Sequence, residues 1–182
     1  MTMLGAIVAG GAARRFGGDK GAALLCGTAL VDHVAAALAL QTDDLVIVGR
    51  SWPGLRRLED RPNAGEGPLG GLNAALRHAR DTGHEAVLCA GCDTLPVPPD
   101  LAERLGPGPA VVDGHWLMGL WPADLADDLD RWLHDQDDRS IRGWMRQAGA
   151  RRVGLDLDFV NINTPGALAD AERLLGRSFQ PR

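Results

Sequence analysis

Residues 4–21 read LGAIVAGGAARRFGGDKG, and this stretch decides the fold that the sequence predicts. Its first part, Leu4–Ala9, is a short, continuous apolar run, as is typical of a strand buried on both faces of a parallel sheet. The run breaks at Gly10 into a segment rich in glycine and basic residues. The stretch therefore predicts a central strand that passes directly into a glycine-rich loop.

Further apolar runs and helical periodicities alternate along the rest of the chain. The predicted strands are Leu45–Val48, Ala86–Ala90, Ala110–Val112, Leu117–Trp121 and Phe159–Ile162. The predicted helices are Leu30–Leu38 with Thr28 as its N-cap, Leu69–Ala79, Asp100–Leu105, Asp124–His134, Ile141–Ala148 and a last one that begins at Thr164-Pro165. This order predicts the α/β class: a single-domain, doubly wound, mostly parallel sheet flanked by helices, with one domain over residues 1–182.

Composition narrows the classes of function. The chain has 182 residues, of which 45% are hydrophobic and 24% charged, as expected of one folded domain. The net charge of −5 disfavours a nucleic-acid partner, and no apolar run is long enough to span a membrane. The odd count of 3 cysteines and the absence of a signal-peptide pattern predict a cytoplasmic protein, and a monomer is expected by default.

The glycine-rich loop has the chemistry of an anion site. Successive glycines let backbone N–H groups approach a phosphate, and Arg14, Arg15 and Lys20 add cationic donors. The loop fits neither the P-loop signature nor the dinucleotide-binding signature. From its residues alone, a solvated surface loop remains an equal alternative.

Three other segments have both functional and structural interpretations. Asp93 ends an apolar strand, where a carboxylate could hold Mg²⁺ beside phosphates or cap the following turn. Glu66–Gly71 could bring backbone close to a flat base or form a plain helix entry. The pair Cys89 and Cys92 is predicted to be structural, because a zinc site would need a second pair.

Five motifs in order resemble those of the molybdenum cofactor guanylyltransferase family, the MobA-like nucleotidyltransferases. They are Val8–Lys20, Glu59-Asp60, Gly67–Gly71, Cys92–Thr94 with Pro98–Leu101, and Phe159–Pro165, and they span nearly the whole chain. The resemblance implies a Rossmann-like nucleotidyltransferase fold. It also implies an enzyme that joins GMP from GTP to the terminal phosphate of molybdenum-molybdopterin and releases pyrophosphate.

The resemblance further assigns roles to residues at matching positions. It implies Arg15, Lys20 and Asp93 as catalytic residues, with Asp93 binding Mg²⁺, and Asn161 and Asn163 on the molybdopterin side. The nucleotide-binding residues that it implies are Val8, Ala9, Gly10, Gly11, Lys20, Asp60, Pro68, Leu69, Gly70, Gly71 and Asp93. GTP and molybdenum-molybdopterin are the implied partners, together with proteins that hand over the cofactor.

The chain departs from the family pattern at two places, and two other functions stay open. The asparagine that usually follows the second strand is absent from Val48-Gly49-Arg50, and the usual His-Pro is replaced by His115-Trp116. Cytidylyl transfer, or nucleotidyl transfer to a sugar or other phosphate, is one alternative, although Ala9-Gly10-Gly11 favours GTP over the Ala-Ala-Gly of cytidylyl relatives. A non-catalytic nucleotide-binding module is the other.

Overall fold

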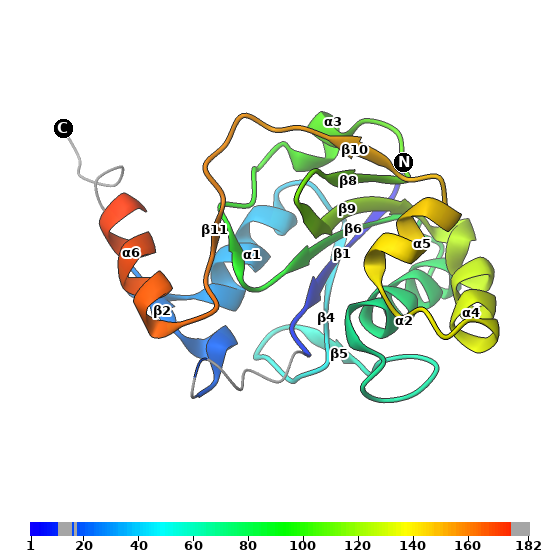
Figure 1. Cartoon of the computed structure of the whole chain (residues 1–182), viewed down its shortest axis with the longest axis horizontal. Helices are drawn as coiled ribbons and strands as arrows, with labels where there is room; N and C mark the ends of the chain where they lie inside the picture. Colours follow the sequence, from blue (N-terminus) through cyan, green and yellow to red (C-terminus); the bar gives the residue numbers. More distant parts are fainter. Residues whose placement is uncertain (11–15, 17, 176–182) are drawn as a thin grey trace.

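The computed structural model describes residues 1–10, 16 and 18–175 of the chain (Figure 1). Within these residues the main sheet has seven strands in the order β10-β8-β9-β6-β1-β4-β5. Their bounds are β1 (Met3–Val8), β4 (Asp44–Val48), β5 (Arg56–Leu58), β6 (Ala86–Gly91), β8 (Ala110–Val112), β9 (His115–Pro122) and β10 (Arg151–Val153).

Most neighbouring strands of this sheet are parallel. Strand β1 pairs in parallel with β4 on one side and with β6 on the other, and β5 continues in parallel beside β4. Strand β9 is the exception, since it runs antiparallel to both β6 and β8. The prediction of a mostly parallel sheet is therefore confirmed.

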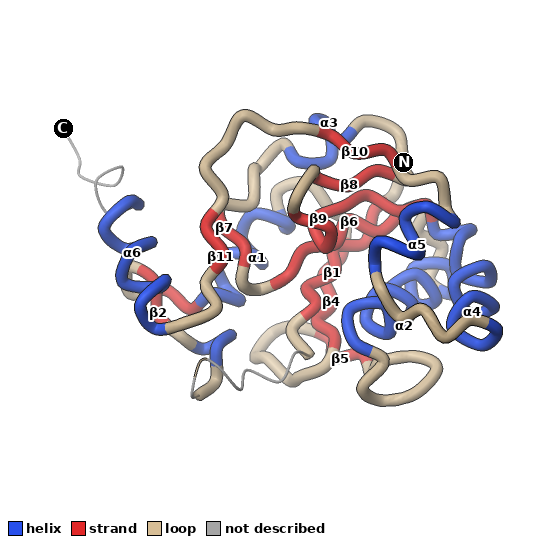
Figure 2. Tube along the Cα trace, in the orientation of Figure 1, coloured by secondary structure: helices blue, strands red, loops and turns tan. Residues whose placement is uncertain are grey.

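Helices cover both faces of the sheet, and each face has its own hydrophobic core (Figures 1 and 2). Helices α1 (Leu30–Ala39) and α3 (Leu101–Leu105) pack on one face. Helices α2 (Gly67–Asp81), α4 (Ala126–Asp135) and α5 (Ile141–Gln147) pack on the other. The doubly wound arrangement that the sequence predicts is thus confirmed.

Strand β1 shows why its sequence is apolar throughout. Leu4 and Ala6 belong to the core beneath α2, whereas Ile7 belongs to the core beneath α1. Alternate side chains of a strand point to opposite faces, so a strand covered on both sides cannot carry a polar stripe.

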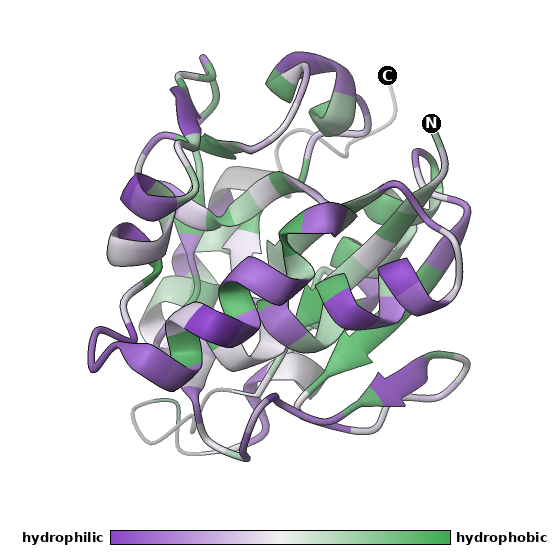
Figure 3. Cartoon of the chain, turned by 90° about the vertical axis from the view of Figure 1, so that its right-hand side faces the viewer, coloured by the Kyte–Doolittle hydropathy of each residue, from purple (hydrophilic) through white to green (hydrophobic). Residues whose placement is uncertain are grey.

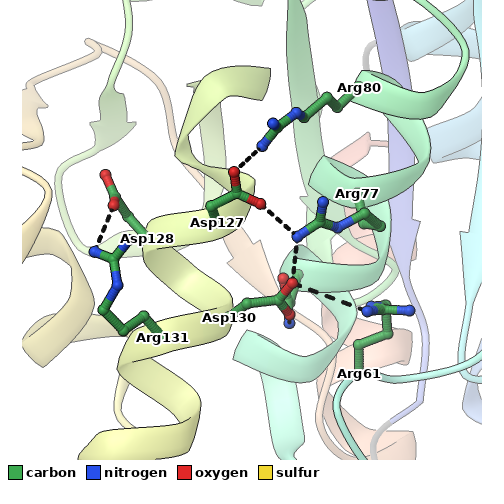
Figure 4. Close-up of polar contacts among 8 residues, drawn as sticks. Arg61, Arg77, Arg80, Asp127, Asp128, Asp130 and Arg131 are labelled. Atoms are coloured by element: carbon green, nitrogen blue, oxygen red, sulfur yellow. Dashed lines mark hydrogen bonds and ion pairs between the residues drawn. The ribbon is translucent and has the colours of Figure 1, made fainter.

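An ion-pair network joins α2 to α4 along their outer sides (Figure 4). Arg77 Nη2 lies 2.8 Å from Asp127 Oδ1 and also donates to Asp130. Asp130 in addition accepts a hydrogen bond of 2.6 Å from the buried Asn73, and Arg80 pairs with Asp127. Figure 3 shows hydrophilic and hydrophobic residues mixed along the helices of this side, as amphipathic helices require.

The start of α1 corrects one prediction. Thr28 does not cap the helix, because it lies in β3 (Thr28–Ala29), which pairs with β2 (Leu24–Leu25). The two short strands close around Cys26 and Gly27, both with positive φ. The residue at the N-cap is Ala29, which has no side-chain oxygen to accept a hydrogen bond.

The last predicted strand is shorter than expected and lies outside the main sheet. Strand β11 (Val160–Asn161) pairs antiparallel with β7 (Thr94–Leu95), which follows the end of β6. Helix α6 (Pro165–Leu175) follows and contacts β11 and β2. This small ribbon brings the C-terminal part of the chain to the carboxyl end of β6.

Within the described ranges, none of the helices has both the length and the apolar character needed to cross a membrane.

Candidate active site

The candidate site lies where the strand order reverses. From β1 the chain passes to β4 and β5 on one side and then to β6 on the other. In open α/β sheets ligands bind at such a point, beyond the carboxyl ends of the strands. Gly10 follows β1 and Asp93 follows β6, so two predicted site residues lie at this point.

Lys20 contacts two other predicted site residues. It begins the short 3-10 helix η1 (Lys20–Ala22), and its Nζ donates to Asp93 Oδ2 at 2.8 Å and to Asn163 Oδ1 at 3.1 Å. The Lys20 and Asp93 side chains are 18% and 30% exposed, so the pair is half-buried but open to a ligand. The structure therefore brings the glycine-loop lysine, the acid after β6 and the C-terminal asparagine together.

Asn161 joins the same cluster through Thr94. The Thr94 hydroxyl donates to Asn161 Oδ1 at 2.8 Å, and Thr94 follows Asp93 directly. The backbone N–H of Ile162 also donates to the carbonyl of Asp93 at 2.8 Å. The ribbon of β7 and β11 thus fixes Asn161 and Asn163 beside the acid.

The glycine loop leaves β1 in close contact with the end of β4. Ala9 N–H donates to the carbonyl of Val48 at 3.0 Å, and Gly49 then takes φ +87°. A Cβ atom on Gly49 would lie 2.3 Å from Gly10 Cα, so only glycine fits there. Gly49 and Arg50 thus follow β4 directly, where the sequence resemblance leads us to expect an asparagine.

The entrance of α2 is equally tight. Gly70 lies in the first turn of α2 and packs against Asp60, since a Cβ atom on Gly70 would lie 3.2 Å from Asp60 Cβ. A Cβ atom on Gly71 would lie 3.0 Å from Val8 Cγ1. Asp60 follows β5, and its Oδ1 faces Gly10. Pro68 is exposed at the same end of the helix, whereas Leu69 is buried in the core.

The predicted site residues thus form two groups. Val8, Gly10, Asp60 and the Pro68–Gly71 turn lie together between β1, β4 and α2. Lys20, Asp93, Asn161 and Asn163 form the polar cluster beyond β6. Among the residues that the structure describes, no hydrogen bond or ion pair joins Asp60 to Lys20 or Asp93. Gly11 and Arg15, also predicted for the site, lie outside the described residues.

Arg50 is a residue that the sequence did not indicate. Its guanidinium pairs with both carboxylate oxygens of Asp19, the residue before Lys20, and lies 5.0 Å from the centroid of the Trp52 ring. This pair holds the pKa of the Asp19 carboxyl below its usual value. Asp19 in turn accepts a hydrogen bond from the N–H of Ala22. The turn that carries Lys20 is therefore anchored to the end of β4.

Cys89 and Cys92 are buried thiols of the hydrophobic cores. Both are buried and free, and burial raises their thiol pKa values to about 12 and about 11. A thiol with such a pKa is not ionised near neutral pH and is therefore a poor nucleophile. This agrees with the prediction that the pair is structural.

A cavity of about 260 Å³ lies beside the polar cluster. It is bounded by Asn161 and Thr94 on one side, Pro68 on another, and His115 and Trp116 at the start of β9. The His115 ring lies 4.5 Å from the Phe159 ring, and burial lowers the pKa of His115. The cavity therefore offers neutral, partly aromatic walls next to Asn161.

Known proteins resemble the chain along most of its length. The family model of the MobA-like NTP transferase domain matches residues 5–152. A protein of Cereibacter sphaeroides named molybdenum cofactor guanylyltransferase is 40% identical over 192 residues, which cover 96% of this chain and 98% of that protein. A protein of the same name from Acidiphilium cryptum is 38% identical over 180 residues, covering 91% and 92%.

A solved structure shows the same fold. Molybdopterin-guanine dinucleotide biosynthesis protein A from Archaeoglobus fulgidus has a TM-score of 0.75 and 23% sequence identity, over 96% of this chain and 99% of that one.

Proposed function

The chain belongs to the MobA-like NTP transferase family and is a nucleotidyltransferase, and on this premise we propose that it transfers GMP from GTP to the terminal phosphate of molybdenum-molybdopterin. The two relatives named as guanylyltransferases of this cofactor support the choice of substrates. The single structural observation behind the proposal is the meeting of Lys20, Asp93 and Asn163 at the strand-order reversal.

The reaction is one substitution at phosphorus. An oxygen of the acceptor's terminal phosphate forms a bond to the α-phosphorus of GTP. The bond from that phosphorus to the oxygen bridging it to the β-phosphate breaks, and pyrophosphate leaves with the electron pair. Such a transfer needs alignment and neutralisation of charge rather than a covalent intermediate on the protein.

The nucleotide side consists of the glycine loop and its cationic donors. Backbone of Val8, Ala9, Gly10 and Gly11 would bind the nucleotide, and Arg15 and Lys20 would neutralise the triphosphate. Lys20 is within reach of the reacting groups, because its Nζ already contacts Asp93 and Asn163. When a triphosphate binds, we expect Lys20 to exchange part of these contacts for phosphate oxygens.

The base would lie against α2. Asp60 and the turn formed by Pro68, Leu69, Gly70 and Gly71 are the proposed contacts. Because Gly70 and Gly71 carry no side chains, the backbone at the start of α2 packs closely against Asp60 and Val8, which supports a role for this backbone at the edge of the nucleotide site. GTP is proposed rather than CTP because of the sequence Ala9-Gly10-Gly11.

Asp93 would hold Mg²⁺ together with substrate phosphates. Mg²⁺ in such enzymes characteristically takes only one or two carboxylates and completes its shell with phosphates and water. The residues fit this mode, since Asp93 is partly exposed and no cluster of three or more His, Cys, Asp or Glu occurs in the described part of the chain. When bound, the ion would supply Lewis-acid polarisation of the phosphate and neutralise charge.

The acceptor would approach from the ribbon of β7 and β11. Asn161 and Asn163 would orient its terminal phosphate, and the hydrogen bond from Thr94 fixes the Asn161 amide for this task. Asn161 also borders the 260 Å³ cavity, which leaves space for the acceptor beside it. Donor and acceptor would then meet at Lys20.

The test is release of pyrophosphate by purified protein with GTP and Mg²⁺, with and without molybdenum-loaded molybdopterin. We expect release only when the acceptor is present, and a loss of at least about 100-fold in kcat for Asp93→Asn. Asp128→Asn, an exposed acid of α4, is the matched control and should retain activity.

Three outcomes would contradict the proposal. The wild type failing with a verified acceptor would refute it, and full activity of Asp93→Asn would refute the assigned role of that acid. Selective turnover or stabilisation by CTP would instead support the cytidylyl alternative, because only a bound nucleotide raises the melting temperature.

A further inference from the structure

A second, larger cavity lies on the outer side of Trp116. Its volume is about 720 Å³, and it is bounded by Trp116 of β9, by Arg142, Met145 and Arg146 of α5, and by Arg152 of β10. We call these residues the arginine pocket. Nothing in the proposed reaction so far uses it.

The positive charge of the arginine pocket is largely free for a ligand. The Arg142 guanidinium lies 4.9 Å from the centroid of the Trp116 ring. Arg142 and Arg146 are four residues apart on one helix and are exposed, and neither forms an ion pair with a residue that the structure describes. Arg152 has one loose partner, Asp113, at 3.8 Å.

Asp138 offsets part of this charge. Its carboxylate accepts a hydrogen bond of 2.8 Å from the backbone of Ser140 at the start of α5, and it interacts electrostatically with Arg146. Arg142 has no ion-pair partner among the described residues, so the pocket keeps a positive charge. Three guanidinium groups around an indole ring form a site for a flat molecule that carries negative charge.

The arginine pocket adjoins the smaller cavity of the candidate active site at Trp116. The same side chain bounds the 260 Å³ cavity that also contains Asn161. Ile141 lies in that smaller cavity, and Arg142 follows it in the larger one. A ligand bound beside Asn161 that extends over Trp116 would therefore come next to Arg142.

We infer that the arginine pocket binds the pterin and the anionic metal-bearing end of the acceptor. This inference rests on the proposed function and extends its acceptor site beyond Asn161 and Asn163. The terminal phosphate lies beside Lys20 and Asp93, while Trp116 and Arg142 contact the planar ring and Arg146 and Arg152 hold the oxyanion charge. A concave site with an aromatic wall and guanidinium groups fits a compact, planar, anionic heterocycle better than an extended acidic peptide.

The experiment measures equilibrium binding of molybdenum-loaded molybdopterin, without nucleotide, to wild type and variants. We expect the double variant Arg142→Ala with Arg146→Ala to lose at least about tenfold in affinity. Arg142→Lys should retain part of it, because the charge remains without the planar stacking. Arg131→Ala, which removes an exposed arginine of α4, is the matched control and should bind as the wild type does.

The same variants in the transfer assay separate this inference from the proposed function. We expect the acceptor KM of the double variant to rise about tenfold, with the GTP KM and melting temperature unchanged. Unchanged acceptor affinity would overturn the inference. A defect seen only when a carrier protein delivers the acceptor would also overturn it, in favour of protein docking. Failure of the wild type to transfer GMP would refute the proposed function. The equilibrium binding measurement would still show whether the arginine pocket holds the acceptor.

Discussion

Replacement of Gly49 by alanine tests the contact between β1 and β4 that forms the floor of the candidate site. Gly49 has φ +87°, and an added Cβ atom would lie 2.3 Å from Gly10 Cα and 2.8 Å from Gly10 N. Both atoms belong to backbone, so neither can rotate away. Gly10 must therefore move if the variant folds.

The expected cost has two parts. A left-handed backbone conformation costs a non-glycine residue about 1–2 kcal/mol. Forcing an extra carbon into a filled space adds about 1–3 kcal/mol. The free energy of unfolding of Gly49→Ala should thus fall by about 2–5 kcal/mol. Gly54→Ala is the matched control, because Gly54 has φ +78° but no atom within 4 Å of the added carbon, so it should lose only the first part.

Urea unfolding of both variants and titration with GTP give the measurement. Because Gly10 belongs to the loop proposed to hold the nucleotide, Gly49→Ala should also raise the Kd for GTP by about tenfold or more, whereas Gly54→Ala should not. Equal effects of the two substitutions on stability and on GTP affinity would refute the reasoning. The contact with Gly10 would then not constrain the loop.

Three other perturbations follow from contacts described above. Arg50→Ala releases Asp19 and should raise the GTP KM several-fold in steady-state kinetics, with partial rescue in Arg50→Lys. An unchanged KM would argue against anchoring of the turn that carries Lys20. Arg77→Ala removes the link between α2 and α4 and should lower the free energy of unfolding, measured in urea, by about 1–3 kcal/mol. A loss below about 0.5 kcal/mol would show that the ion-pair network does not stabilise the fold. Iodoacetamide near pH 8 should label the exposed Cys26 and spare Cys92, as mass spectrometry can check. Burial raises the Cys92 pKa to about 11, above the usual thiol value. The contribution of the protonated Cys92 thiol to the free energy of unfolding is therefore complete below the usual thiol pKa, and it is lost as the pH rises toward 11.

The sequence predicted the centre of the sheet better than its edges. Leu4–Ala9 and Ala86–Ala90 are apolar because helices cover both of their faces, and such runs are visible without a structure. The edge strands β5 and β10 each begin with two arginines and have one covered side at most, so no apolar run marks them. The reversed direction of β9 depends on pairing and cannot be read from its residues.

The candidate site was predictable where its residues belong to a recognisable motif. Lys20, Asp93 and Asn163 were each indicated by a motif, and the structure brings them together. Arg50 was missed because its role depends on a partner 31 residues away and on the stacking of Trp52. Residue type alone gave no signal there, although the glycine before it marked a tight turn.

The antiparallel strand β9 brings a separate segment of the chain, His115 and Trp116, to the cavity of the candidate site. Since β9 starts rather than ends beside the polar cluster, the wall that includes His115 and Trp116 is reached through the short Asp113-Gly114 hairpin. Lengthening or rewriting that hairpin leaves the segments after β1 and β4 untouched. Such a change would therefore alter the wall beside Asn161, on the proposed acceptor side, while the proposed nucleotide side keeps its sequence.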